Sequence, residues 1–503
     1  MWTRLENEDR LLDGLGTVHQ GKLMNFTPTR PVRPETELLM MPTESARLRV
    51  TVKPSQCMLR LITQLSEAET ELRRIAHRTR ADQVVHKEAT VREILQNVRR
   101  HGDEALLRYT LEFDQVDLSA AELVVSTSEL DAAYQRVSTG LLKALRLAKQ
   151  RIEQFHRERI PKTWVQFQDK GIILGKRITP VDAAGLYIPG GQASYPSTVL
   201  MNAIPAMVAG VPRVVIVTPP GPDGAVNPVV LVAAQEAGVH EIYRVGGAQA
   251  IGALAFGTRT ILPVDVITGP GNVYVTLAKK LVYGEVGIDS LAGPSEILII
   301  ADSTANPVFL ATDLLAQAEH DSLASAILLT PDARIAEATL KEVNRRLENH
   351  PRRTLTEKSL AHYGLVVVTQ DLSEAAALSN LFAPEHLELA VDDTWNLLKQ
   401  IRHAGAIFLG HATPEAVGDY LAGPNHTLPT CGTARFASPL GVETFLKTSS
   451  LVQYTPQALA EVSEAIDQLS TAEGLPSHGD SVRVRIDAYE HPPTIPHSDQ
   501  EEP

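Results

Sequence analysis

"EILIIADSTANPVFLATDLLAQAEHDSLASAILLT", residues 296–330, contains a complete strand–helix–strand unit. Its two ends, 296–301 and 326–330, are short apolar runs of strand length. The segment between them opens a helix at Asn306-Pro307, with proline in its favoured first-turn position, and the helix is expected to run over 307–320. Further short apolar runs alternate with helical stretches, which predicts a largely parallel α/β architecture. These runs are 183–188, 213–218, 264–268, 364–369 and 406–410.

The number of such units predicts two Rossmann-like parallel-sheet domains, at 178–295 and 296–435. Residues 58–177 form an N-terminal helical segment that carries no obvious chemistry and reads as scaffold. Leu145, Ala148, Ile152 and Phe155 recur there at helical spacing. Residues 436–490 form a C-terminal arm with a helix near 456–472. Ser66 with Glu69, and Ser126 with Glu129, are capping-box candidates in the helical segment.

The two ends of the chain lack the periodicity of folded segments. Residues 1–57 mix acids, bases and prolines, without the basic start and apolar stretch of a secretory signal. We expect them to be a disordered extension, or a product of start-codon choice. Residues 491–503 are expected to be a loose tail.

Composition excludes several classes of protein. Of 503 residues, 44% are hydrophobic and 21% charged, and the net charge is −13 with no basic run, which argues against nucleic acid or a membrane as partner. No apolar run approaches the ~18 residues of a membrane span. The only cysteines, Cys57 and Cys431, allow neither a disulfide framework nor a thiolate zinc site. The simplest interpretation is a cytoplasmic protein whose main partner is a small molecule.

Three glycine-rich segments follow strand candidates of the first α/β domain and precede helices. Backbone N–H groups at such places can hold phosphate. None of the three matches G-x-G-x-x-G, and each alone is better interpreted as a tight turn than as a ligand loop. Together they make a nucleotide site a reasonable alternative. The segments are "YIPGGQASYPST" (187–198), "VGGAQAIG" (245–252) and "TGPGNVYVT" (268–276).

Candidate ligand residues are scattered over the second half of the chain. Gln317 and His320 stand at i and i+3 on one helix face, either as ligands or as a polar helix end. Asp419 and His426 lie in a Gly/Pro-rich loop expected at the carboxyl end of a strand, where Asp419 could also be a turn or cap residue. Glu473 and His478 follow a helix on a segment expected to be irregular. Such a pair is ordinarily exposed and inert.

Glu385 and His386 are adjacent in the mostly apolar run "LFAPEHLELA", 381–390. Ionisable groups in such a place cost folding free energy unless they have partners. A structural pair and a catalytic pair are both consistent with the local sequence.

Together these segments resemble the histidinol dehydrogenase family over roughly Met58 to Tyr489. The departures are the additional N-terminal residues and a short insertion near "PPGPDGAVNP", neither of which touches a motif. The motifs are "GLYIPGG", "VGGAQAIGALAFGT", "TGPGNVYV", "AGPSE", "LLAQAEH", "APEHLEL", "GDYLAGPNHTLPT" and "EGLPSH".

The resemblance implies oxidation of L-histidinol through L-histidinal to L-histidine, with two NAD molecules, one water and one Zn²⁺ per subunit of a homodimer. It implies His386 as general base in both oxidations and Glu385 as activator of the water that attacks the aldehyde. The other implied roles are zinc ligation by Gln317, His320, Asp419 and His478; substrate contact by Ser295, Glu473, His386 and those four ligands; and NAD contact by Tyr187, Gln249 and Asn272.

Because His478 and Glu473 lie outside the α/β domains, we expect shared active sites, with the arm of one subunit completing the site of the other. Two rival functions are a related dehydrogenase acting on another alcohol, such as a sulfonated one, and a non-catalytic binding protein. The presence of Glu473 and His478 favours histidinol over the first, and the joint presence of base, water activator and ligands argues against the second.

Overall fold

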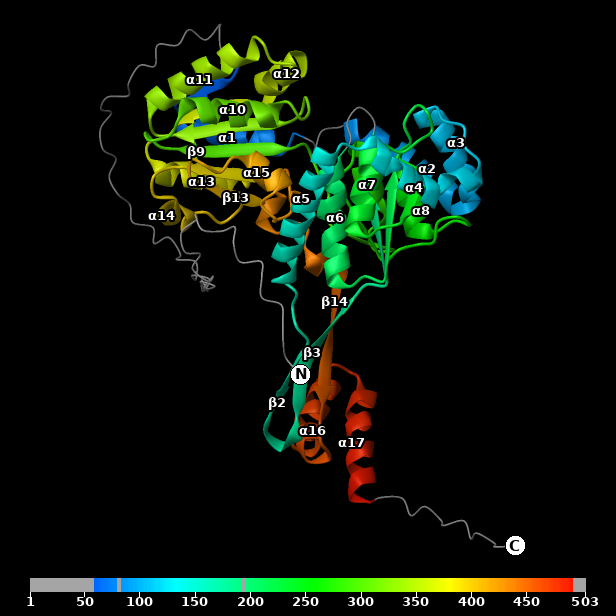
Figure 1. Ribbon diagram of the computed structural model, residues 1–503. Coiled ribbons are helices and arrows are strands. Elements are labelled where there is room, and N and C mark those ends of the chain that lie inside the picture. Colours follow the sequence, from blue (N-terminus) through cyan, green and yellow to red (C-terminus); the bar gives the residue numbers. More distant parts are fainter. Residues whose placement is uncertain (1–57, 79–82, 191–194, 492–503) are drawn as a thin grey trace, which may run out of the picture. The chain divides into compact units, whose positions relative to one another are not determined.

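The computed structural model describes residues 58–78, 83–190 and 195–491 (Figure 1). The predicted disordered extension, 1–57, and residues 492–503 of the predicted loose tail lie outside the described residues. Within the part described, no helix combines the length and hydropathy needed to cross a membrane.

The opening stretch, 296–330, forms β9 (Glu296–Ala301), α10 (Pro307–Ala318) and β10 (Ser325–Thr330), which confirms the predicted unit. The helix is two residues shorter than expected. These strands lie in a six-stranded parallel sheet of order β1-β11-β10-β9-β12-β13. Its other strands are β1 (Arg60–Ile62), β11 (Gly364–Val368), β12 (His386–Ala390) and β13 (Ala406–Leu409).

Helices cover both faces of this sheet, and neighbouring residues of β9 divide between two cores. Ile297 and Ile299 pack with one set of helices, and Leu298 and Ile300 with the other. A strand buried on both faces has no polar side, so its sequence is an almost continuous apolar run. The first set is α10, α11 (Ala333–Leu347) and α12 (Arg353–Tyr363). The second is α1 (Leu65–Ala76), α13 (Leu372–Phe382) and α14 (Thr394–Leu398).

A five-stranded parallel sheet of order β6-β5-β4-β7-β8 forms the first α/β domain. Its strands are β4 (Ala183–Tyr187), β5 (Arg213–Thr218), β6 (Glu241–Arg244), β7 (Val266–Thr268) and β8 (Gly287–Ile288). One face carries α2 (Gln83–His101), α3 (Asp103–Asp114), α8 (Gly247–Phe256) and α9 (Val273–Val282). The other carries α4 (Thr127–Ala133), α5 (Thr139–Arg157), α6 (Pro196–Ala209) and α7 (Pro228–Ala237).

The N-terminal helical segment packs against both sheets. Strand β1 is the edge strand of the six-stranded sheet and α1 packs on that sheet, whereas α2 to α5 cover the five-stranded one. The capping box of Ser126 and Glu129 is confirmed at α4. The one expected at Ser66 is wrong, because α1 begins at Leu65 and Ser66 lies inside its first turn. The predicted domain boundaries remain predictions.

The C-terminal arm contributes one strand to a third, antiparallel sheet of order β14-β3-β2. Sequence analysis missed β2 (Trp164–Phe167), β3 (Ile173–Pro180) and β14 (Leu446–Gln453), because their side chains are largely exposed and show no apolar alternation. The helix expected near 456–472 is confirmed as α16 (Pro456–Ala472), and α17 (Pro476–Glu490) packs against it.

Candidate active site

Glu385 and His386 lie at the amino end of β12, beside the amino end of β9, where Glu296 begins the strand. This is the point where the strand order reverses, since β10 lies on one side of β9 and β12 on the other. These residues therefore lie at the opposite ends of the strands from those at which open α/β sheets usually bind ligands. Sequence analysis also missed β12, because its polar residues interrupt the apolar run that marks the other strands.

His386 is a buried imidazole with one free nitrogen. Its Nδ1 lies 3.0 Å from the backbone carbonyl of Glu296. Its Nε2 lies 3.9 Å from Oδ1 of Asp419 and has no hydrogen-bond partner within the described residues. Burial lowers the pKa of His386 to about 4, so the ring is neutral near pH 7. A neutral ring with Nδ1 protonated presents the lone pair of Nε2, as a general base requires.

Glu385 and Glu296 are joined by two hydrogen bonds, each from the backbone N–H of one residue to the carboxylate of the other. The N–H of Glu296 donates to the Glu385 carboxylate at 2.8 Å, and the N–H of Glu385 donates to the Glu296 carboxylate at 3.3 Å. Burial, followed by the charge of Glu296, raises the pKa of Glu385 well above its ordinary value. A carboxylate with a raised pKa is a stronger base than an exposed one.

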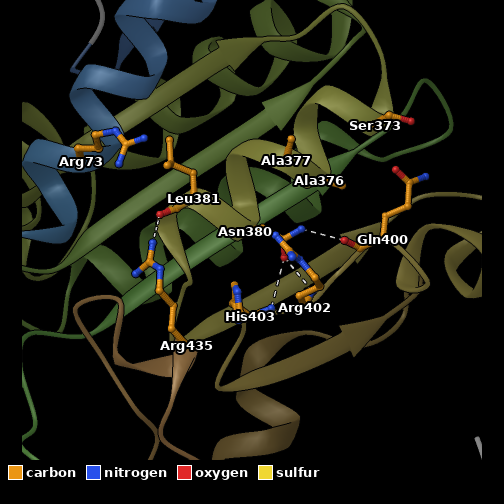
Figure 2. Close-up of a pocket in the computed structure, with 10 residues that line it drawn as sticks. All are labelled: Arg73, Ser373, Ala376, Ala377, Asn380, Leu381, Gln400, Arg402, His403 and Arg435. Carbon is orange, nitrogen blue, oxygen red and sulfur yellow. Dashed lines mark hydrogen bonds between the residues drawn. The ribbon is translucent and has the colours of Figure 1, made fainter. Parts of the chain in front are cut away.

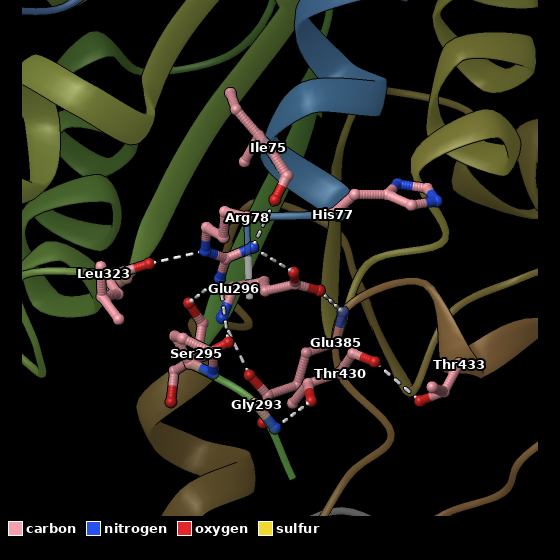
Figure 3. A network of polar contacts seen from close by, with 12 residues as sticks. Ile75, His77, Arg78, Gly293, Ser295, Glu296, Leu323, Glu385, Thr430 and Thr433 are labelled. Atoms are coloured by element: carbon pink, nitrogen blue, oxygen red, sulfur yellow. Dashed lines mark hydrogen bonds and ion pairs between the residues drawn. The ribbon is translucent and has the colours of Figure 1, made fainter. Parts of the chain in front are cut away.

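Arg78 balances the negative charge of the Glu296 carboxylate, as Figure 3 shows. Its Nη1 lies 2.7 Å from Oε1 of Glu296, and both side chains are buried. The guanidinium also donates to the carbonyls of Ile75, Leu323 and Pro294, at 2.9, 2.7 and 3.0 Å. Sequence analysis missed both residues, since it treated Arg78 as scaffold and Glu296 as the start of a strand. The available signal was a glutamate opening a fully apolar strand, which requires a buried cation.

Two of the predicted metal ligands, His320 and Asp419, come together with a third acidic residue near His386. Within the described residues, His320, Asp419 and Glu415 have ligand atoms within 4.8 Å of one another. Asp419 and Glu415 belong to α15 (Glu415–Tyr420), so the expected loop at Asp419 is a helix. Gln317 is fully buried in the last turn of α10, and His320 follows the end of that helix. Glu415 is a residue that sequence analysis missed.

Glu415 also fixes the Gln317 side chain. The hydrogen-bond network assigns the amide nitrogen of Gln317 to the side facing Glu415, at 3.0 and 3.1 Å from its two oxygens. The amide oxygen is then turned away from these acceptors and is available to a cation. Burial, and then the nearby acids Asp419, Glu385 and Glu388, raise the pKa of Glu415. A divalent ion would relieve this crowding of carboxyl groups, and imidazole, carboxylate and amide donors fit zinc without excluding related ions.

The structure does not bring His478 or Glu473 into this cluster. Glu473 caps the end of α16, and His478 lies in the first turn of α17, with both side chains exposed. The irregular segment expected there is instead a helix end followed by a second helix. Ser295 precedes β9 and is adjacent to Glu296, so it lies at the same edge of the sheet as the base.

The residues expected to contact NAD lie at carboxyl ends of strands in the five-stranded sheet. Tyr187 ends β4, Asn272 caps α9 after β7, and Gln249 lies in the first turn of α8 after β6. Strands β5 and β7 flank β4 on opposite sides, which creates a switch point of the kind that binds nucleotides. The Tyr187 hydroxyl accepts the N–H of Gly247 at 3.2 Å.

The available polar atoms differ among these three residues. Gln249 is buried, and neither atom of its amide has a hydrogen-bond partner in the described part of the chain. The side-chain oxygen of Asn272 already accepts the N–H groups of Tyr274 and Val275, so only its nitrogen remains for a ligand. Gly269 permits close backbone approach, since a Cβ there would lie 2.1 Å from the Tyr187 carbonyl oxygen. Residues 191–194 of the first glycine-rich segment lie outside the described residues.

His426, whose role sequence analysis left open, forms a hydrogen bond with the backbone of Asp419. Its Nδ1 lies 3.0 Å from the Asp419 carbonyl, and its Nε2 lies 3.5 Å from the hydroxyl of Thr198 on α6. The helix that carries Asp419 is thereby tied to a helix of the first α/β domain.

Comparison with known proteins gives a consistent result. The family model described as histidinol dehydrogenase matches residues 77–486, and a domain of unknown function matches residues 1–44. The chain is 79% identical over 445 residues to the histidinol dehydrogenase of Gloeobacter violaceus, covering 88% of this chain and 100% of the relative. It is 68% identical to histidinol dehydrogenase 2 of Nostoc sp., covering 85% and 99%. The crystal structure of histidinol dehydrogenase from Elizabethkingia anophelis matches with a TM-score of 0.81 at 38% identity, covering 86% and 99%.

Proposed function

Because the chain belongs to the histidinol dehydrogenase family, we propose that it catalyses the NAD-dependent, four-electron oxidation of L-histidinol through L-histidinal to L-histidine, the final step of histidine biosynthesis. The observation that carries this proposal is the buried His386, whose Nε2 lies 3.9 Å from Asp419 and has no hydrogen-bond partner among the residues that the structure describes. A base beside a group of metal-binding side chains is the arrangement that oxidation of a chelating amino alcohol requires.

Gln317, His320 and Asp419 would hold a zinc ion, with His478 as the fourth ligand. The support is the convergence of His320 and Asp419 and the orientation of the Gln317 amide. Such an ion, with no thiolate ligand, would supply open positions for the imidazole and amine nitrogens of histidinol. Fixing both ends of the substrate places its carbinol carbon and can lower the barrier by several kcal/mol. Ser295 and Glu473 would add contacts to the substrate.

In the first oxidation, Nε2 of His386 would take the hydroxyl proton of histidinol, and NAD, when bound, would supply the acceptor for the hydride that leaves the carbinol carbon. The product is the aldehyde. The hydrogen bond from Nδ1–H to the Glu296 carbonyl favours this step, because it stabilises the ring as it becomes cationic. After hydration of the aldehyde, the same nitrogen would take a hydroxyl proton of the hydrate, and a second bound NAD would supply the acceptor for the hydride released from carbon.

Between the two oxidations, Glu385 removes a proton from the water that attacks the aldehyde. Its raised pKa makes the carboxylate a competent base, and its backbone link to Glu296 fixes its position. Because Glu385 precedes the strand and His386 begins it, the two side chains can serve different atoms.

NAD would bind at the switch point of the five-stranded sheet, in contact with Tyr187, Gln249 and Asn272. The buried amide of Gln249, which lacks protein partners among the described residues, supports this assignment. The protein would act as a cytoplasmic homodimer, with one Zn²⁺ per subunit. Glu473 and His478 of one subunit would complete the site of the other, which accounts for their exposure in a single chain.

The direct test is the stoichiometry of NADH formation from L-histidinol. We expect two NADH for each L-histidine formed, and no NADH from simple sulfonated diols. Reduction of NAD by a sulfonated diol in preference to histidinol would assign the chain to the rival substrate class.

A further inference from the structure

A cavity of about 480 Å³ lies outside the cluster of catalytic and metal-binding candidates (Figure 2). It is bounded by the end of α1, α13 from Ser373 to Leu381, the loop before β13 and the short helix Thr433–Arg435. None of the residues assigned to substrate, zinc or NAD above lines it. Its volume falls within the range of about 300–1,000 Å³ that small-molecule sites occupy.

The charged side chains around this cavity are all basic. Arg73, Arg402 and Arg435 line it, together with His403, and no aspartate or glutamate does. Among the described residues, none of these three arginines forms an ion pair with a carboxylate. Burial, and then the charges of Arg402 and Arg435, lower the pKa of His403, so the local potential is positive. In a chain with a net charge of −13, three uncompensated guanidinium groups around one hollow require an explanation.

The walls of the cavity are fixed by hydrogen bonds that leave much of this donor capacity unused. The guanidinium of Arg435 donates to the carbonyls of Leu381 and Gly432. The Asn380 side chain accepts the N–H of Arg402 at 2.7 Å and donates to the Gln400 carbonyl at 2.8 Å. Figure 2 shows Asn380 connecting the helix to the loop in this way. No hydrogen bond of the Arg73 or Arg402 guanidinium is found within the described part of the chain.

We propose that this cavity binds a small phosphorylated metabolite through Arg73, Arg402 and Arg435. A guanidinium presents planar, paired N–H donors that match phosphate oxygens, and a phosphate monoester or diphosphate carries enough charge to offset several arginines. Ser373 and Gln400 supply neutral polar groups for the remainder of such a ligand.

The position of the cavity also predicts which backbone segments a bound ligand would stabilise. Pro384 and Glu385 accept the N–H groups of Gly405 and Ala406, at 2.9 and 2.8 Å. The loop and helix that line the cavity therefore continue into the two segments that hold the Glu385 backbone. An anion bridging them should protect the amides of 380–385 and 400–406 from hydrogen exchange.

The test is calorimetric titration of the complete metal-loaded protein with pyrophosphate, at low ionic strength. We expect Arg402→Gln and Arg73→Gln each to weaken binding by tenfold or more, since each removes a charge-assisted contact. Arg345→Gln, on α11 away from the cavity lining, is the matched control and should bind as the wild type does. Arg73 and Arg402 are exposed, and neither guanidinium forms a hydrogen bond or ion pair among the described residues, so both variants should remain folded.

Hydrogen exchange separates this site from the other places where pyrophosphate could bind. Protection confined to the glycine-rich segments or to the zinc ligands, with equal affinity in all three variants, would overturn the proposal. So would the absence of binding. Inorganic phosphate as a second probe should bind more weakly, because it carries fewer oxygens and less charge. These measurements use no histidinol, so their outcome is independent of the proposed reaction.

Discussion

The backbone carbonyl of Glu296 lies 3.0 Å from Nδ1 of His386. A carbonyl only accepts hydrogen bonds, so this contact places the ring proton on Nδ1 and leaves Nε2 as the basic atom. The same residue holds Glu385 through its own N–H and its carboxylate. Glu296 thus contacts both members of the proposed catalytic pair while touching neither substrate nor cofactor in the proposed scheme.

Replacing His386 by Asn should depress both oxidations by the ~10²–10⁴-fold that loss of a general base typically costs. Asparagine keeps a polar side chain of similar reach but cannot take the proton. The two half-reactions can be followed as NADH formation from histidinol and from histidinal. Loss of only one of them would show that the base differs between the two steps.

Replacing Glu385 by Gln should mainly slow the oxidation of histidinal, because only that half-reaction needs an activated water. The raised pKa of Glu385 gives this step a characteristic pH dependence in the wild type. The carboxyl must be ionised to act, so the rate of histidinal oxidation should fall as pH drops through that pKa, at a higher pH than an ordinary glutamate would give. Glu385→Gln should abolish this limb of the profile. Equal losses in alcohol oxidation would exclude the water-activating role.

Arg78 and Glu296 should be coupled in stability. Arg78→Met leaves the buried Glu296 carboxylate uncompensated, and we expect the free energy of unfolding to fall by ~3–5 kcal/mol. The double variant with Glu296→Gln should recover part of that loss, since the amide needs no counter-charge. Urea denaturation of the four proteins forms a double-mutant cycle. Additive losses would mean that the two side chains do not depend on each other.

Glu415 should control metal retention without being one of the expected ligands. Glu415→Gln removes the negative charge and replaces one of the two oxygens that orient the Gln317 amide with an N–H donor, and outer partners of this kind typically contribute 10–100-fold to metal affinity. Equilibrium dialysis with Zn²⁺ measures this directly, with Glu342→Gln on the surface of α11 as control. In the wild type, chelation should abolish turnover and Zn²⁺ should restore it. Unchanged zinc affinity in Glu415→Gln would exclude a role for Glu415 in orienting the Gln317 amide.

The two parallel sheets were predictable because most of their strands are buried on both faces and therefore appear as apolar runs, as 296–301 and 213–218 do. The strand β12 was not, because its first residue is His386 and its third is Glu388, both buried. Polar residues that a site requires erase the pattern that identifies a strand. The partners of the catalytic pair escaped for a related reason: Arg78 and Glu296 are 218 positions apart, and local sequence does not indicate that they meet.

If active sites are shared between subunits, two inactive variants should complement each other in a heterodimer, whereas sites built from one chain alone predict no recovery. His478 is exposed on α17 and absent from the cluster of His320, Glu415 and Asp419. If His478 acts in the partner's site, Glu385→Gln and His478→Asn should each fail alone to convert histidinol to histidine, yet heterodimers should contain one site with both residues intact and should complete that conversion. Mixing the variants under conditions of subunit exchange should restore up to about a quarter of wild-type activity in random dimers. Mass spectrometry of differently tagged subunits verifies the exchange. Verified heterodimers without recovered activity would place His478 in the site of its own chain.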